Sequence, residues 1–235
     1  MLPRLLAATS ALVLAACGGG GGSADAPPDI DNGSCGDTLR FTGEYVDWDT
    51  DAKFCGINMA TLQVQGDGAM DSTNPNGRFD LCIPSTAATT KLDVIQPAGN
   101  SECTAVPSGY TIPTLIVANK AVILSGGFQS ARAWTTERQA TFFASIGQTY
   151  DSNKAQVHVH VDGTARAVSL SAAHGAAQAI VTTTWAPGDT GHEVFFPNVE
   201  VGSGTTMLTV AGGATGTGSI PLVANTITSV TVRAH

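Results

Sequence analysis

Short apolar runs, many alternating with polar residues, recur along the chain and are separated by turn-forming clusters such as Asp67-Gly68. A period of two is typical of strands that bury one face, because successive side chains point to opposite faces of a sheet. The pattern predicts strands at residues 39–46, 60–64, 77–83, 92–95, 115–117 and 121–124, and in a second series at residues 156–161, 168–170, 179–183, 194–196, 207–210 and 226–232.

The segment between the two series has helical spacing instead. Phe142 and Ile146 are four residues apart, and Thr136-Glu137-Arg138-Gln139 has the spacing of a capping box. Gly147 stands where a C-cap glycine is expected. We therefore expect a helical connector at residues 126–150.

The N-terminal segment has the layout of an export signal. Arg4 precedes an apolar run, which ends in Leu14-Ala15-Ala16-Cys17 and is followed by five glycines. This resembles a bacterial lipoprotein signal peptide, in which cleavage precedes the Cys and acyl chains on that Cys hold the protein to a membrane. The run is too short for a transmembrane helix, which needs about 20 residues. The resemblance implies lipidation of Cys17, and Gly18 after it favours the outer membrane, on its periplasmic face or at the cell surface.

Two stretches repeat one local pattern. Asn74 to Pro84 and Asp189 to Pro197 each contain a turn ending in Gly, an alternating strand and a Pro that stops it. The strands Leu92-Asp93-Val94 and Met207-Leu208-Thr209-Val210 follow. This resembles the carboxypeptidase regulatory-like, or transthyretin-like, module. The resemblance implies a seven-stranded antiparallel Greek-key sandwich that acts as a non-catalytic spacer, folding aid or binding module, although Ser85 to Thr90 replaces the usual tight turn.

The expected fold is all-β, with two antiparallel Greek-key (transthyretin-like) sandwiches joined by a short helix after a disordered N-terminal tether. The predicted parts are a signal peptide (1–16), a lipidated Cys with a flexible linker (17–36), a first sandwich with disulfides (37–125), a helical connector (126–150) and a second sandwich (151–235).

The charge of the chain limits its partners. The formal net charge is −8, and no run of basic residues is present. Nucleic acid is therefore excluded as an expected partner. The expected partners are the membrane, through the lipid, and a protein or carbohydrate ligand, with no cofactor.

The cysteines other than Cys17 all lie in the first half, at Cys35, Cys55, Cys82 and Cys103. An even set in one segment of an exported chain predicts two disulfides, for which three pairings are possible. We favour Cys35 with Cys55 and Cys82 with Cys103, because the strand at 77–83 turns Cys82 outward toward a later loop.

His158 and His160 are the most suggestive metal ligands. They alternate on one strand and so share a face, which makes a metal half-site conceivable. Val157, Val159 and Val161 would fill the core from the opposite face. We therefore expect both imidazoles on the solvent side, without a metal.

The same pair also bears a resemblance to the intradiol ring-cleavage dioxygenases, which bind ferric iron through two Tyr and a His-x-His strand. Tyr110 and Tyr150 precede His158 and His160. The Arg and Pro context of that family's strand is missing, and Tyr150 is too close to the histidines in the sequence. An iron enzyme is thus the alternative to a non-catalytic protein.

Two further patterns are weaker. Asp47, Asp49 and Asp51 have the spacing that begins a calcium loop, but Ala52 and Asn58 stand where that loop needs Gly and Glu. A sugar-stacking surface would need exposed Trp side chains, and a carbohydrate-binding lipoprotein is a third hypothesis. The candidates are Trp48, Trp134 and Trp185. No Gly-x-Ser-x-Gly or His-Glu-x-x-His motif is present, so no catalytic residue is predicted.

Overall fold

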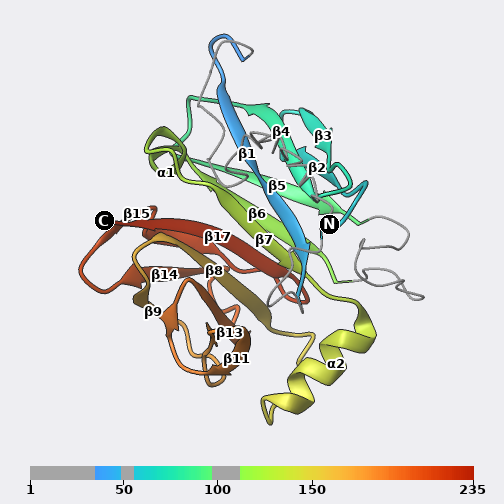
Figure 1. Cartoon of the computed structure of the whole chain (residues 1–235), viewed down its shortest axis with the longest axis vertical. Coiled ribbons are helices and arrows are strands. Elements are labelled where there is room, and N and C mark those ends of the chain that lie inside the picture. The colour runs from blue at the N-terminus through green and yellow to red at the C-terminus, as the bar shows by residue number, and fades with distance from the viewer. Residues whose placement is uncertain (1–34, 49–55, 97–111) are drawn as a thin grey trace, which may run out of the picture.

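The computed structural model describes residues 35–48, 56–96 and 112–235, and within them the predicted all-β, sandwich-like fold is confirmed (Figure 1). No helix in these ranges is long and apolar enough to span a membrane. The helices are α1 (Lys120–Leu124) and α2 (Thr136–Ser145). The strands are β1 (Leu39–Asp47), β2 (Thr61–Val64), β3 (Met70–Ser72), β4 (Arg78–Ile83), β5 (Thr89–Ile95), β6 (Thr114–Asn119), β7 (Gln129–Ala133), β8 (Ala155–Gly163), β9 (Arg166–Leu170), β10 (Gln178–Val181), β11 (Thr184–Pro187), β12 (Thr190–Gly191), β13 (Glu193–Val199), β14 (Thr205–Val210), β15 (Ala214–Thr215), β16 (Gly218–Pro221) and β17 (Ile227–Ala234).

The described strands form three sheets in layers. A ten-stranded central sheet has the order β11-β10-β13-β8-β17-β6-β5-β2-β3, with β15 paired to β17. The three-stranded sheet β4-β1-β7 packs against one face of β2, β5 and β6. The four-stranded sheet β12-β9-β14-β16 packs against the opposite face of β8, β13 and β17. Strand β7 also lies across β17 and β8 (Figure 1), which places one sheet edge over the middle of the central sheet.

Each half of the chain supplies its own hydrophobic core, but the halves share a sheet. The first core comes from residues 39–133, and the second comes from residues 155–234 together with Val117. Strand β17 pairs in parallel with both β6 and β8, so hydrogen bonds connect the two halves. The predicted connector at 126–150 begins with a strand, β7, which pairs in parallel with β1. Independent folding of the two halves stays a prediction.

Helix α2 confirms the predicted helix, with its start shifted by one residue. Thr135 rather than Thr136 is the N-cap, and its hydroxyl accepts a hydrogen bond from the backbone N–H of Arg138 at 3.2 Å. Gly147 follows the helix with φ of +67°, a conformation that favours glycine. The C-terminal signal was therefore read correctly from the sequence.

Helix α1 replaces the strand expected at 121–124, and that prediction was wrong. The side chain of Asn119 accepts hydrogen bonds from the backbone N–H groups of Ala121 and Val122. Such a cap satisfies amides that have no partner inside the helix, and it starts a helical turn. The short apolar run alone did not distinguish this turn from a buried strand.

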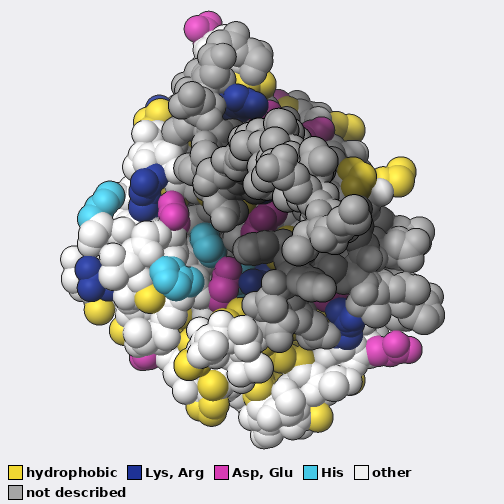
Figure 2. All heavy atoms as spheres, viewed as in Figure 1, with side chains coloured by type: hydrophobic (Ala, Val, Ile, Leu, Met, Phe, Trp, Pro, Cys, Tyr) yellow, Lys and Arg dark blue, Asp and Glu magenta, His cyan; other side chains and the backbone are white. Residues whose placement is uncertain are grey.

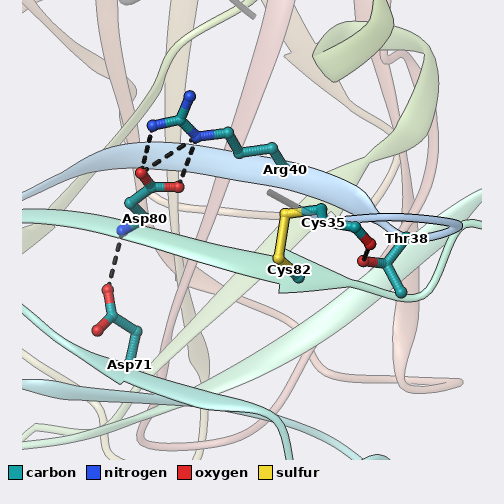
Figure 3. The surroundings of a disulfide bond; sticks show 6 residues. All are labelled: Cys35, Thr38, Arg40, Asp71, Asp80 and Cys82. Atoms are coloured by element: carbon teal, nitrogen blue, oxygen red, sulfur yellow. Dashed lines mark hydrogen bonds and ion pairs between the residues drawn. A yellow bond between two sulfur atoms is a disulfide. The ribbon is translucent and has the colours of Figure 1, made fainter. Parts of the chain in front are cut away.

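The disulfide in the described residues joins Cys35 to Cys82, with Cα atoms 5.4 Å apart (Figure 3). The favoured pairing of Cys35 with Cys55 and of Cys82 with Cys103 was wrong. Cys82 does alternate with buried neighbours on β4, but β4 pairs antiparallel with β1, and this brings the start of the described chain beside Cys82. Cys17, Cys55 and Cys103 lie outside the described residues.

Candidate functional site

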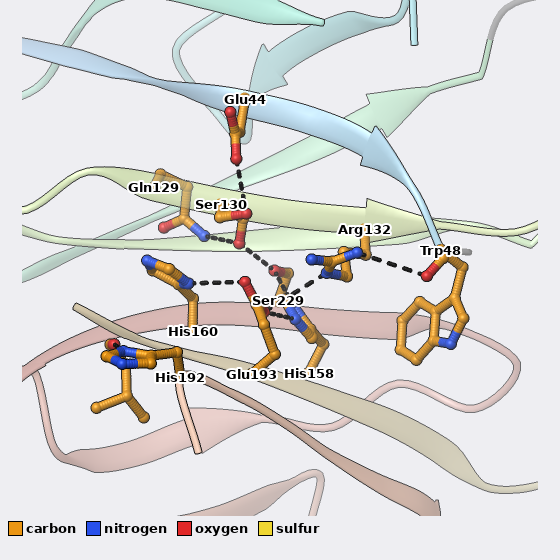
Figure 4. A network of polar contacts seen from close by, with 11 residues as sticks. Glu44, Trp48, Gln129, Ser130, Arg132, His158, His160, His192, Glu193 and Ser229 are labelled. Atoms are coloured by element: carbon orange, nitrogen blue, oxygen red, sulfur yellow. Dashed lines mark hydrogen bonds and ion pairs between the residues drawn. The ribbon is translucent and has the colours of Figure 1, made fainter. Parts of the chain in front are cut away.

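A polar cluster lies where β7 crosses the central sheet (Figure 4). On β8, His158 is opposite Ser229 of β17, while His160 is opposite Glu193 of β13, so all four side chains share one face. Strands β7 and β1 contribute from the other sheet. We define the polar cluster as Glu44, Ser130, Arg132, His158, His160, Glu193 and Ser229.

Glu193 is the centre of this cluster. One of its carboxylate oxygens lies 2.5 Å from Nε2 of His158, and the other lies 2.9 Å from Nδ1 of His160. The Nε atom of Arg132 is 3.5 Å from the first of these oxygens. The guanidinium and the carboxylate are both buried, with side-chain exposures of 4% and 11%. A single carboxylate therefore joins two strands of the central sheet to β7.

A chain of hydroxyl groups continues the cluster toward the three-stranded sheet. The hydroxyl of Ser229 lies 3.1 Å from Nδ1 of His158 and 3.4 Å from the backbone oxygen of Ser130. Ser130 in turn donates from its own hydroxyl to Glu44 at 3.2 Å. Its backbone oxygen also accepts a hydrogen bond from the Gln129 side chain at 3.2 Å. The contacts thus run without interruption from β13 to β1.

Burial and the charge of neighbouring groups shift the pKa values of Glu193 and His158 in opposite directions. Burial by itself would raise the pKa of Glu193, but Arg132 and the imidazoles of His160 and His158 outweigh it and hold this pKa well below its ordinary value. Burial lowers the pKa of His158, and attraction to Glu193 offsets this only in part. At neutral pH, Glu193 is therefore ionised and His158 is neutral.

The pKa values of His160 and Glu44, at the outer side of the cluster, are both raised. Burial would lower the pKa of His160, but the carboxylates of Glu193, Asp162 and Glu44 outweigh it, so this pKa is raised. Burial raises the pKa of Glu44, although His160, Ser130 and Arg132 oppose the effect. His160 is therefore the imidazole that gains a proton first.

The structure corrects the prediction that both imidazoles face solvent. Val157, Val159 and Val161 are fully buried in the second core, as expected. The opposite face of β8 is covered too, because β7 lies over it, and His158 has 0% exposure. His160 is partly buried, with a side-chain exposure of 19%. Figure 2 shows histidine, acidic and basic side chains close together near the middle of one face.

The cluster does not have the geometry of a metal site. Within the described ranges, no group of three or more His, Cys, Asp and Glu side chains is arranged to hold a metal ion. Both ring nitrogens of His158 are within hydrogen-bond distance of protein side chains. In addition, the guanidinium of Arg132 already places a positive charge beside Glu193. A metal ion would have to displace these contacts.

Of the two tyrosines in the dioxygenase hypothesis, the structure describes Tyr150, and its contacts are with residues outside the polar cluster. Tyr150 donates its hydroxyl hydrogen to Asn225 at 2.8 Å and packs edge-on against Phe143. Burial, with a smaller effect of Asp151, raises its pKa to about 12, so its hydroxyl is protonated at neutral pH. Tyr110 lies outside the described residues.

Ser229, His158 and Glu193 form a linear array that sequence analysis missed. A hydroxyl on one ring nitrogen and a carboxylate on the other is the arrangement of a serine nucleophile with its base and orienting acid. Ser229 and His158, however, both have 0% exposure, so a substrate cannot reach the hydroxyl. The sequence signal that could have indicated it is the alternation of polar residues with buried valines, as for Ser229 beside Val230 in β17.

Trp48, Trp134 and Trp185 do not together form the open stacking surface that the carbohydrate hypothesis requires. Trp48 and Trp134 are buried at 1% and 0% exposure in an aromatic core with Phe142, Phe143 and Phe195. Trp185 is partly exposed, but one of its faces stacks on Trp48 at 5.1 Å between ring centroids. The rings of Trp48 and His158 also pack in a T-shaped arrangement with 5.7 Å between their centroids, so this core adjoins the polar cluster.

The first residue of the incomplete calcium-loop pattern, Asp47, has a structural partner. Asp47 is fully buried at the end of β1 and forms an ion pair with Arg138 of α2. Its carboxylate therefore ties the helix to the sheet. Asp49 and Asp51 lie outside the described residues.

Comparison with known proteins gives little further information. No protein-family model matches the chain, and no curated protein sequence matches it. One solved structure similar to the chain is a mutant of the shaft pilin SpaA from Lactobacillus rhamnosus GG, at 10% sequence identity. The alignment covers 84% of this chain and 98% of the pilin, with a TM-score of 0.26. A TM-score this low supports no conclusion about function.

Proposed function

We propose that this protein is a lipid-anchored protein of the bacterial envelope whose β-sandwich fold has a structural or ligand-presenting role without catalysis. The anchoring part rests on the sequence Leu14-Ala15-Ala16-Cys17, which resembles the cleavage and lipidation site of bacterial lipoproteins. Gly18 favours the outer membrane as its location. Stable anchoring requires more than one acyl chain, and the triacylated Cys of lipoproteins supplies this.

The observation that carries the non-catalytic part is the closure of the polar cluster. The array of Ser229, His158 and Glu193 has no exposed hydroxyl, since Ser229 and His158 both have 0% exposure. Its central carboxylate is engaged on both oxygens. Reaction with an external substrate needs an accessible group in a concave site, which this array does not offer.

The same contacts give the cluster a structural role. They connect β1 and β7 of the three-stranded sheet with β8, β13 and β17 of the central sheet. Buried polar groups that are mutually satisfied allow far fewer arrangements than an apolar contact does. The cluster would thereby hold the two sheets in one relative position and keep the outer surfaces fixed for a partner.

Anchoring is tested by replacing the lipidated residue. The Cys17→Ser variant should remain uncleaved by the lipoprotein peptidase and carry no acyl chains, whereas a Ser23→Ala control in the glycine-rich tether should be processed normally. Mass spectrometry of the N-terminal peptide and membrane fractionation provide the measurements. An unmodified Cys17 in the wild-type protein would refute the anchor.

The absence of catalysis is tested with a serine-reactive fluorophosphonate probe on the full chain. We expect no labelling of the folded wild-type protein, because the hydroxyl of Ser229 is sealed between the sheets. Labelling that appears in the wild type and disappears in Ser229→Ala would show a reactive serine and would refute the proposal.

A further inference from the structure

The hydroxyl of Ser229 has one hydrogen and two acceptors within reach. Nδ1 of His158 lies 3.1 Å from its oxygen, and the backbone oxygen of Ser130 lies 3.4 Å away. A serine hydroxyl donates once and can accept as well. It can therefore donate to only one of these groups at a time.

The protonation of His158 decides which acceptor is used. An ionised carboxylate can only accept, so Nε2 of His158 must carry the hydrogen that faces Glu193 at 2.5 Å. When the ring is neutral, its Nδ1 has a lone pair and accepts from Ser229. When a proton from solvent binds to Nδ1, that nitrogen becomes a donor and Ser229 must accept.

We propose that Ser229 is a two-position hydroxyl switch that transmits the protonation of His158 to strand β7. With neutral His158, the Ser229 hydrogen points to the imidazole. With protonated His158, the same hydrogen turns to the backbone oxygen of Ser130 and adds a hydrogen bond between the central sheet and β7. No covalent bond forms or breaks, except the N–H bond made by the added proton.

The backbone oxygen of Ser130 can accept the additional hydrogen bond from Ser229. Its backbone oxygen already accepts from the Gln129 side chain at 3.2 Å, and a carbonyl oxygen has two lone pairs. Its hydroxyl donates to Glu44, so β1 lies one hydrogen bond further along the chain of contacts. A stronger bond at Ser130 would therefore tighten the three-stranded sheet onto β17.

Charged groups on β13, β7, β8 and β1 set the pH range of the switch. Glu193 of β13 attracts the added proton, whereas Arg132 of β7 and His160 of β8 repel it. Burial also opposes protonation, and the pKa of His158 is therefore lowered from its ordinary value. Glu44 of β1 and Asp162 of β8 act mainly on His160. On β17 the facing groups are hydroxyls, those of Ser229 and Thr231. The switch accordingly operates at acidic pH, below the range of an ordinary histidine.

The test follows two sites of the folded full chain by NMR during an acid titration. Imidazole ¹⁵N shifts report the tautomer and protonation of His158, and the ¹³C shift of the Ser130 carbonyl reports its hydrogen bonding. We expect the Nε2–H tautomer at neutral pH and a Ser130 carbonyl shift that follows the titration of His158. In Ser229→Ala, the Ser130 shift should no longer follow it.

Thr231→Val is the matched control. Thr231 lies two residues further along β17 on the same face, and its buried hydroxyl has no hydrogen-bond partner among the described residues. This variant should keep the coupled titration. A coupling that survives in Ser229→Ala, an Nδ1–H tautomer in the neutral wild type, or unfolding before His158 takes up a proton would each overturn the proposal. The wild-type tautomer and the wild-type Ser130 shift can still refute the proposal if Ser229→Ala fails to fold.

Discussion

Replacing Glu193 by Gln should remove a large part of the stability of the fold. The substitution preserves the shape of the side chain but deletes the charge that lies 3.5 Å from the buried guanidinium of Arg132. It also replaces one of the two carboxylate oxygens that contact His158 and His160 by an amide NH2 group, which donates and cannot accept. Arg132 would then remain at 3% exposure without this carboxylate.

The expected magnitude follows from the cost of breaking a buried ion pair. Removal of one partner costs about 3 to 5 kcal/mol, because the remaining charge stays in a poorly solvated position. We expect the lower end, about 3 kcal/mol, because Glu44 also attracts Arg132. This corresponds to a roughly 100-fold smaller folding constant.

Urea denaturation at pH 7, followed by tryptophan fluorescence, gives the measurement. The midpoint should fall while the slope of the transition stays the same, which indicates lost stability without a change in the surface exposed on unfolding. Glu137→Gln is the matched control, since Glu137 is exposed in the first turn of α2 and its loss should cost at most about 0.5 kcal/mol. If Glu193→Gln cost no more than this control, the buried ion pair would not stabilise the fold.

Three other predictions concern pH, the disulfide and the two halves. The pKa of His160 is raised in the folded protein, so its contribution to stability is fully present below the ordinary pKa of 6.5 and is lost as the pH rises through the pKa of the folded state. His160→Gln should therefore flatten the fall in melting temperature on the alkaline side. An unchanged profile would show that His160 is not coupled to folding. Replacing Cys35 and Cys82 together by Ser should lower the free energy of unfolding by about 2 to 4 kcal/mol, because the bridge closes a loop across a sequence separation of 47. Non-reducing peptide mapping of the wild-type protein should recover these two residues as one linked pair. A fragment of residues 151–235 should melt cooperatively, since it contains nearly all of the second core. Its melting temperature should lie below that of the intact chain, because it loses the pairing of β17 with β6. An unfolded fragment would show that the second half depends on the first.

The local features of this fold were readable from the sequence. Alternation correctly assigned Val157, Val159 and Val161 to a buried face, because a strand permits only two directions for its side chains. The helix around Phe142 was predicted by spacing, and Gly147 marked its end. Each of these signals depends on residues a few positions apart.

The features that depend on distant strands were not readable. His158 was expected in solvent because nothing in its own strand indicates that β7 crosses above it. The partner of Cys35 follows from the pairing of β1 with β4, and the cluster needs β17 to lie beside β8. A side chain's neighbours within its strand fix which face it is on, but only the topology fixes what covers that face.

A purely apolar contact could bind these two sheets as tightly as the polar cluster does, because a buried ion pair gains little net stability over well-packed hydrophobic residues. What the cluster adds is a requirement for one alignment of the strands. Glu193 meets both imidazoles only while it lies opposite His160. A shift of β13 by one residue along β8 would turn the carboxylate to the other face, among Val159 and Val161, where no charge could be satisfied. A misaligned sheet would leave these charges unsatisfied, and the free energy this costs is larger than the net stability that the charges add to the correct sheet. Their main contribution is therefore to specify the register of β13 on β8.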